Sequence, residues 1–232
     1  MKVRMRFSKE GSLKFIGHLD VMRYFQKLIR RADIPISYSE GFSPHQIMSF
    51  AMPLGIGDES VGEYVDIDIS TPISSDEAIK RLNEKSVPEI KVLSFKEIPD
   101  TKATNAMSSI SAAEYEIRFR EEANIDFDLK EKMLELMNLN QINVVKQSKK
   151  TVSELDIKPF IYKWDVYDDV VKILVSCGSV MNIKPELVMK ALFEYLGREF
   201  DEYYVMIKRL EMFTGEKDSL TSLDDIGKNI EL

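Results

Sequence analysis

Only two histidines occur in the chain of 232 residues, His18 in "FIGHLDVMRY" and His45 in "YSEGFSPHQIMSF". Histidine is the side chain whose ordinary pKa lies closest to neutral pH, so a pair of them can perform general acid–base chemistry or contact an anion. His18 stands where a helix is expected to begin. His45 follows Gly41, Ser43 and Pro44 in a turn-rich segment. Whether the two form one site depends on the elements that position them.

The amino-terminal half predicts the order strand, helix, strand, strand, helix, strand. "KVRMRF" at 2–7 alternates basic and apolar residues, as a half-buried strand does. From Asp20, which suits a helix N-cap, apolar residues recur at helical spacing up to "DIP" at 33–35. The elements expected after this helix are strands at 35–39, 47–52 and 62–70, a helix from "SSDEAIKRLNEK" and the strand "EIKVLSFKEI".

The same order recurs in the second half, from "EYEIRFR" to "YYVMIKRLEMF". A β-α-β-β-α-β order is that of a split β-α-β unit, so we expect the α+β class with two tandem ferredoxin-like units. The expected boundaries are an amino-terminal unit at 1–98, a connector at 99–113, a carboxy-terminal unit at 114–213 and a polar, frayed tail at 214–232.

Connectivity in such a unit predicts that the two histidines meet. Strand one ends, helix one begins and strand two ends at the same edge of the sheet, so the loop 39–45 is expected beside the start of the first helix. Free helix N–H groups at that edge suit an anion. The predicted anion-binding or substrate-binding residues are His18, Asp20, Gly41, Ser43 and His45. The alternatives are that Asp20 only caps the helix, that Gly41 only supplies a positive φ, and that His45 only bonds within a turn.

A basic stripe on the first helix is a second candidate site. Arg23, Lys27, Arg30 and Arg31 lie opposite its apolar face, and residues 1–50 carry nine Lys/Arg and four Asp/Glu within a chain of net charge −7. Such a stripe can follow the phosphates of a nucleic acid, although an ordinary solvated face has the same composition. A further patch of low specificity is predicted in the loop after residue 145, at Lys146, Lys149 and Lys150.

Several classes of function lack their motifs. The single cysteine, Cys177, ends an apolar run and is expected to be a buried thiol, so no disulfide, cysteine-based iron–sulfur cluster or zinc site is expected within the chain. Neither a phosphate-binding loop, a G-x-G-x-x-G fingerprint nor an H-E-x-x-H motif occurs. We therefore expect no cofactor and no metal. No apolar run is long enough for a membrane span, which favours a cytoplasmic protein without membrane contact.

The stretch "LKFIGHLDVMRYFQKLIRRADIPISYSEGFSPHQIMSFAMPLGIGDESVGEYVDIDI" resembles the opening of the radical-SAM-linked domain family. The motifs that correspond are "HLD", "YSEGFSPH", the P-L-G-x-G turn and "GEY-x-D"; "ELDIKPFIY" is similar to a later segment. That family occurs alone or fused behind a cobalamin-binding radical S-adenosylmethionine (SAM) protein. The resemblance implies the stand-alone partner form and, through the ribonuclease and ribosomal genes often encoded nearby, a link to RNA. It carries no catalytic residue over to this chain.

Three functions compete at this point. The first is a non-catalytic partner of a radical SAM enzyme that binds RNA or another anionic substrate and takes part in RNA modification or processing. The second is a metal-independent endoribonuclease, similar in architecture to CRISPR repeat-processing enzymes, with His18 and His45 as the candidate catalytic residues. The third is a protein–protein adaptor that docks through its acidic carboxy-terminal half.

Overall fold

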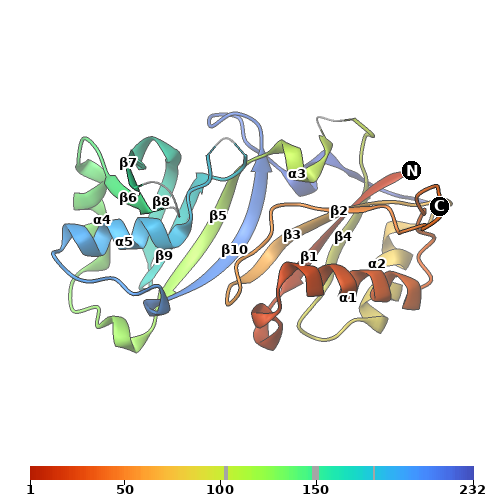
Figure 1. The fold of residues 1–232 in the computed structure, drawn as a ribbon, viewed down its shortest axis with the longest axis horizontal. Helices are drawn as coiled ribbons and strands as arrows, with labels where there is room; N and C mark the ends of the chain where they lie inside the picture. The colour runs from red at the N-terminus through yellow and green to blue at the C-terminus, as the bar shows by residue number, and fades with distance from the viewer. Residues whose placement is uncertain (102–103, 148–151, 180) are drawn as a thin grey trace. The chain divides into compact units, whose positions relative to one another are not determined.

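The computed structural model describes residues 1–101, 104–147, 152–179 and 181–232. Two compact units share the chain: Met1–Ser111 with Arg209–Leu232, and Ala112–Lys208. Figure 1 shows strands and helices in both units, so the α+β class predicted from the sequence is confirmed. None of the described helices is long and apolar enough to cross a membrane.

The first unit is an antiparallel sheet with two long helices. Its strands lie in the order β4-β1-β3-β2, and β1 pairs with both β3 and β4. This is the strand order of a split β-α-β unit. The elements are β1 (Lys2–Lys9), the 3-10 helix Gly11–Phe15, α1 (His18–Arg31), β2 (Met48–Phe50), β3 (Glu59–Asp68), α2 (Ser75–Lys85) and β4 (Val92–Glu97).

Alternation along β1 sends its side chains to the two faces of the sheet. Val3, Met5 and Phe7 are buried against Phe25 and other apolar residues of α1 and α2, which form one core with the sheet. The alternation predicts that Arg4 and Arg6, which lie between them, face solvent, but neither side chain is fully solvated. Arg4 is only 1% exposed, because the segments that follow β4 and β10 cover this second face.

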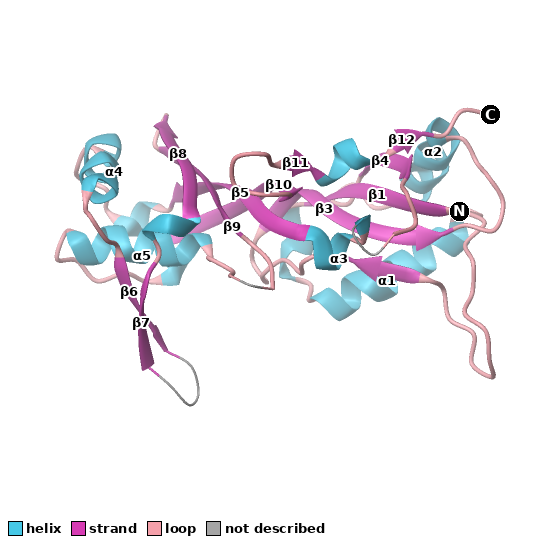
Figure 2. Ribbon diagram, turned by 90° about the horizontal axis from the view of Figure 1, so that it is seen from above, coloured by secondary structure: helices cyan, strands magenta, loops and turns pink. Residues whose placement is uncertain are grey.

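The segment between α1 and β2 departs from the prediction of a strand at 35–39. Ile36 bridges Ile69 and Met48 pairs with Ile67, so both ends of the segment lie beside β3. Residues 37–47 leave the sheet between these points as a hairpin closed by the Tyr38–Gln46 bridge. We call residues 37–47 the finger; Figure 2 shows it as the long loop that projects between α1 and β2.

The second unit has the strand order β10-β5-β9-β8, again that of a split β-α-β unit. The predicted strand "INVVKQS" does not join this sheet, because β6 pairs with β7 as a separate two-stranded sheet. Assignment of two ferredoxin-like units stays a prediction. The elements are β5 (Ile110–Phe119), α4 (Leu129–Asn138), β6 (Asn143–Gln147), β7 (Val152–Asp156), β8 (Ile161–Tyr167), β9 (Val170–Ser176), α5 (Pro185–Tyr195) and β10 (Val205–Thr214).

The first unit includes residues 99–111 of the expected connector and the tail. The connector carries the short helix α3 (Ala106–Ser109), and the tail forms β11 (Thr221–Ser222), a 3-10 turn and β12 (Lys228–Asn229). β12 pairs with β4, and Leu223 is fully buried. The tail is therefore not frayed: backbone pairing and one apolar anchor hold a segment whose composition is mostly polar.

Candidate functional site

His18 is the first residue of α1, directly after Gly17, which occupies the N-cap position. The prediction that Asp20 caps this helix is wrong. Asp20 lies inside the first turn, is exposed and forms an ion pair of 3.4 Å with Arg23. Its carboxylate still stabilises the helix, because a negative charge near the amino-terminal end of a helix is favourable.

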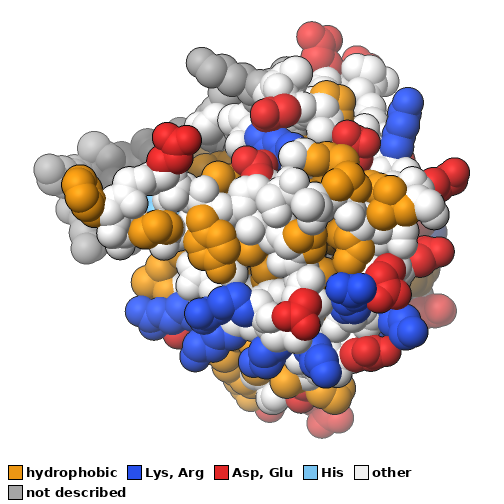
Figure 3. Space-filling view, turned by 90° about the vertical axis from the view of Figure 1, so that its right-hand side faces the viewer, with side chains coloured by type: hydrophobic (Ala, Val, Ile, Leu, Met, Phe, Trp, Pro, Cys, Tyr) orange, Lys and Arg blue, Asp and Glu red, His pale blue; other side chains and the backbone are white. Residues whose placement is uncertain are grey.

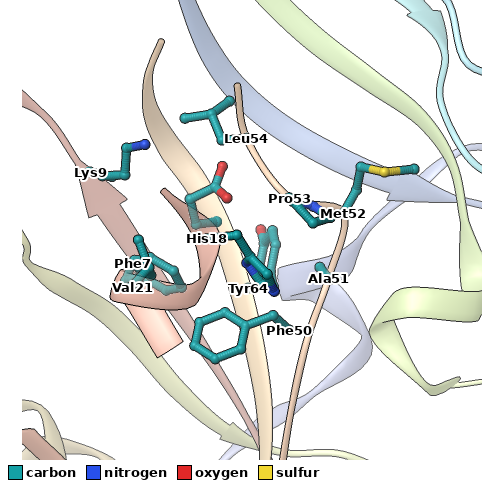
Figure 4. Close-up of a pocket in the computed structure, with 11 residues that line it drawn as sticks. Phe7, Lys9, His18, Val21, Phe50, Ala51, Met52, Pro53, Leu54 and Tyr64 are labelled. Atoms are coloured by element: carbon teal, nitrogen blue, oxygen red, sulfur yellow. The ribbon is translucent and has the colours of Figure 1, made fainter. Parts of the chain in front are cut away.

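The His18 ring lies in a small pocket at the end of β1. The ring meets the edge of Phe50 at 5.5 Å between centroids, with an interplanar angle of 89°. Figure 4 shows Phe7 and Lys9 from β1, Tyr64 from β3 and residues 51–54 converging around it. We call this the His18 pocket. Most of the residues that line it are apolar, and the polar groups of Lys9, His18, Glu63 and Tyr64 among them determine what it can bind.

Lys9 is the least expected of these polar groups. Lys9 is only 3% exposed, and its Nζ donates to the carbonyl of Ile16 at 3.4 Å. Burial lowers the pKa of Lys9 below its ordinary value; Glu63 and Asp58 act against this shift, and Arg209 adds to it. The sequence pattern predicts an exposed lysine at the end of an alternating strand, and no motif indicates that Lys9 is buried.

Glu63 enters the same pocket, and Arg209, a residue far along the chain, holds its carboxylate. Arg209 of β10 donates from Nε at 2.8 Å and from Nη2 at 2.6 Å to its carboxylate, and from Nη2 to the carbonyl of Met52 at 2.8 Å. Both side chains are almost entirely buried. Bidentate pairing of this kind positions a carboxylate firmly. The partners are 146 residues apart, so the sequence alone gives no signal of the pair.

The structure does not bring His45 to His18, and the prediction of one shared pocket is wrong. The finger leaves the sheet beside Asp68, which pairs with Lys2 at the start of β1, whereas the His18 pocket lies at the other end, beside Lys9. The finger precedes β2 instead of following it. The loop that does follow β2 reaches the 3-10 helix just before α1, since the Gly57 N–H donates to the Lys14 carbonyl at 2.9 Å.

The remaining predicted anion-binding residues, Gly41, Ser43 and His45, all lie on the exposed finger. Gly41 has a φ of +109°, in the region that favours glycine. His45 is tied within the hairpin: its Nδ1 lies 2.8 Å from the Ser39 hydroxyl, and its backbone N–H donates to the same oxygen at 3.1 Å. Whether these residues bind an anion stays a prediction.

Two aromatic side chains stand out on the finger. Phe42, near its tip, is fully exposed, and Tyr38 is half exposed. Aromatic rings exposed on a projecting hairpin are available for contact with a molecule outside the chain. From sequence these rings were read only as parts of a strand and a turn.

The basic stripe on α1 adjoins the finger. All four predicted residues, Arg23, Lys27, Arg30 and Arg31, are exposed. The carbonyl of Gln26 accepts from Nε of Arg30 at 3.3 Å and from Nε2 of Gln46 in the finger at 3.2 Å, so the base of the finger and the stripe meet at one atom. Figure 3 shows Lys and Arg side chains gathered along the side on which Figure 1 places α1 and α2.

The further lysine patch cannot be judged in the same way. Lys146 belongs to β6, and Lys149 and Lys150 lie outside the described residues. Cys177 is buried, as predicted. Among the described residues, no group of three or more His, Cys, Asp or Glu side chains is arranged to hold a metal ion.

Comparison with known proteins identifies a family without a stated activity. No curated protein matches the chain. A family model described as "Uncharacterized protein conserved in bacteria (DUF2344)" matches residues 2–185, which include α1, the finger and the His18 pocket residues of β1 to β3. The chain belongs to the DUF2344 family.

Proposed function

We propose that this protein is a non-catalytic partner of a radical SAM enzyme and binds single-stranded RNA along α1 and the finger. The observation that carries the proposal is the contact at the Gln26 carbonyl, which joins the aromatic finger to the basic stripe. Proteins that bind single strands combine a cationic track for the phosphates with aromatic rings on which bases stack. This surface has both parts side by side.

The charges on the stripe are available to phosphates. Among the described residues, the four of the stripe have one ion pair, an exposed one of 3.4 Å between Arg23 and Asp20. Arg31 donates to the carbonyl of Lys85 at 3.4 Å and lies over the ring of Tyr24, so α2 orients its guanidinium without neutralising it. Exposed ion pairs contribute little, and a phosphate can replace Asp20 as the partner of Arg23.

The radical SAM partner is supported by the resemblance of residues 3–70 alone. Those residues include the stripe and the finger, so RNA and the enzyme would be held by one region of the chain. The partner test is a pull-down in which the captured protein is assayed for an iron–sulfur cluster and for cleavage of S-adenosylmethionine. Capture of such a protein supports the partnership, and its absence from the captured fraction contradicts it.

The endoribonuclease alternative loses its main support. Its two candidate catalytic histidines lie beside opposite ends of β1, which argues against their acting together on one phosphate. The adaptor alternative predicts a different result in the binding experiment below, because an adaptor binds a protein partner and no RNA.

The experiment that tests RNA binding is fluorescence anisotropy with a labelled oligouridylate at low salt. We expect the wild type to bind and Arg23→Glu with Lys27→Glu to bind at least tenfold more weakly. The control is Lys91→Glu with Lys163→Glu, which changes the net charge equally at exposed residues outside the stripe. Equal weakening in both double variants would show a nonspecific charge effect, and no binding by the wild type would refute the proposal.

A further inference from the structure

The ammonium group of Lys9 is buried with most of its hydrogen-bonding capacity unused. An ammonium has three N–H donors. In the part of the chain that the structure describes, Nζ has one acceptor, the Ile16 carbonyl at 3.4 Å, and no carboxylate within the 4.0 Å of an ion pair. Burying a charge without a partner is costly, so a buried ammonium in this state calls for an acceptor from outside the fold.

The neighbouring charges do not supply that acceptor. Glu63 faces the pocket, but its two oxygens are taken by Arg209 at 2.6 Å each. Asp58 acts on Lys9 only through space. His18, from the start of α1, contributes an imidazole ring and no carboxylate. Glu63 and Asp58 attract the ammonium of Lys9 without forming an ion pair with it among the described residues, and Arg209, which pairs with Glu63, opposes this attraction.

The shape of the His18 pocket limits what can enter. The cavity measures about 20 Å³ and is walled by Phe7, Val21 and Phe50, with Leu54 at its side (Figure 4). This volume is small for a ligand pocket, so only the compact end of a ligand can enter it. The first turn of α1 adds the positive end of a helix of 14 residues to the same wall.

We propose that the His18 pocket binds the carboxylate of a small organic acid, which Lys9 holds by a charge-assisted hydrogen bond. The carboxylate occupies the cavity between Lys9 and the His18 ring. The rest of the bound acid extends out of the cavity past Leu54. This site is separate from the RNA-binding surface, because none of the stripe or finger residues lines it.

The test uses acetate as the probe and acetamide, its uncharged analogue of the same shape, as the control. The amide signals of Gly17, His18 and Phe50 are followed by NMR at constant ionic strength and neutral pH. We expect saturable shifts with acetate and none with acetamide. Lys9→Met should bind acetate about tenfold more weakly or not at all, the loss expected for one charge-assisted hydrogen bond. Lys91→Met, a substitution of an exposed lysine in the same unit, should bind as the wild type does.

Absence of saturable shifts with acetate, equal shifts with acetamide, or undiminished binding by Lys9→Met would overturn the proposal. The comparison of the two probes on the wild-type protein decides the matter even if the variant fails to fold. Wild-type protein that binds oligouridylate but not acetate would refute this site and leave the RNA proposal standing. The reverse result would refute only the RNA proposal.

Discussion

Removal of the Asp66 carboxylate should destabilise the first unit strongly. Asp66 and Arg4 form an ion pair with both side chains 1% exposed; Arg4 donates to the two carboxylate oxygens at 2.7 and 3.0 Å. Asp66→Ala leaves a buried guanidinium without its counter-ion, which costs about 3–5 kcal/mol. That is a large fraction of the ~5–15 kcal/mol by which such domains are stable.

The effect should extend to the connector and the tail. Arg4 also donates to the carbonyls of Thr104 and Leu223, and Asp66 accepts from the Ala106 N–H at 2.9 Å. Loss of Asp66 therefore loosens the groups that anchor both segments. Amide hydrogen exchange should accelerate at Ala106 before it does in α1, because local opening precedes global unfolding.

Urea denaturation measures the free energy of unfolding of Asp66→Ala against Asp68→Ala. Asp68 lies on the same strand, is half buried and has no ion pair with any residue in the described part of the chain, so its loss should cost about 0.5 kcal/mol or less. Arg4→Leu with Asp66→Leu should recover much of the stability, since apolar residues can replace a buried pair. A cost below about 1 kcal/mol for Asp66→Ala would refute this account of the second face of the sheet.

Three further predictions concern charge, packing and pH. Four phosphate contacts by the stripe give a slope of about −2.8 for log affinity against log salt, and Arg23→Glu with Lys27→Glu should bring it to about −1.4 in the anisotropy assay. Gly62→Ala should lower the midpoint of thermal unfolding, because a Cβ would lie 2.5 Å from the Leu210 carbonyl; an unchanged midpoint would contradict that close approach. Since the pKa of Lys9 is lowered in the folded state, the unfolded state binds more protons between that pKa and 10.5, and wild-type stability rises with pH across this range. Lys9→Met should therefore be more stable than the wild type, and the difference in free energy of unfolding should be largest at neutral pH. A difference that does not shrink as the pH rises to 10.5 would show that Lys9 does not cause the pH dependence.

The sequence could predict the elements because local patterns determine them. Helical spacing of Phe25, Leu28 and Ile29 gave the buried face of α1, and the order of strands and helices gave the α+β class. The finger was missed because 35–39 and 47–52 both look like strands, and only pairing with β3 shows that the chain leaves the sheet between them.

The candidate site was predicted less completely. The stripe followed from helical spacing, and the importance of the start of α1 followed from connectivity. Lys9, Glu63 and Arg209 carry no local signal, because their burial appears only in the folded sheet, where Glu63 and Arg209 pair across 146 residues. Residue type alone predicts Asp20 as the N-cap, whereas Gly17 holds that position.

The measurement that tests the central claim most directly is oligouridylate binding by Phe42→Ala. The finger and the stripe act as one RNA surface only if the exposed ring of Phe42 stacks on a base. Loss of one such stack should weaken binding by roughly tenfold or more, without a change in the salt slope. Phe15→Ala, which removes another exposed ring of the same unit outside the finger, should leave the affinity unchanged. Wild-type affinity in Phe42→Ala would contradict the claim.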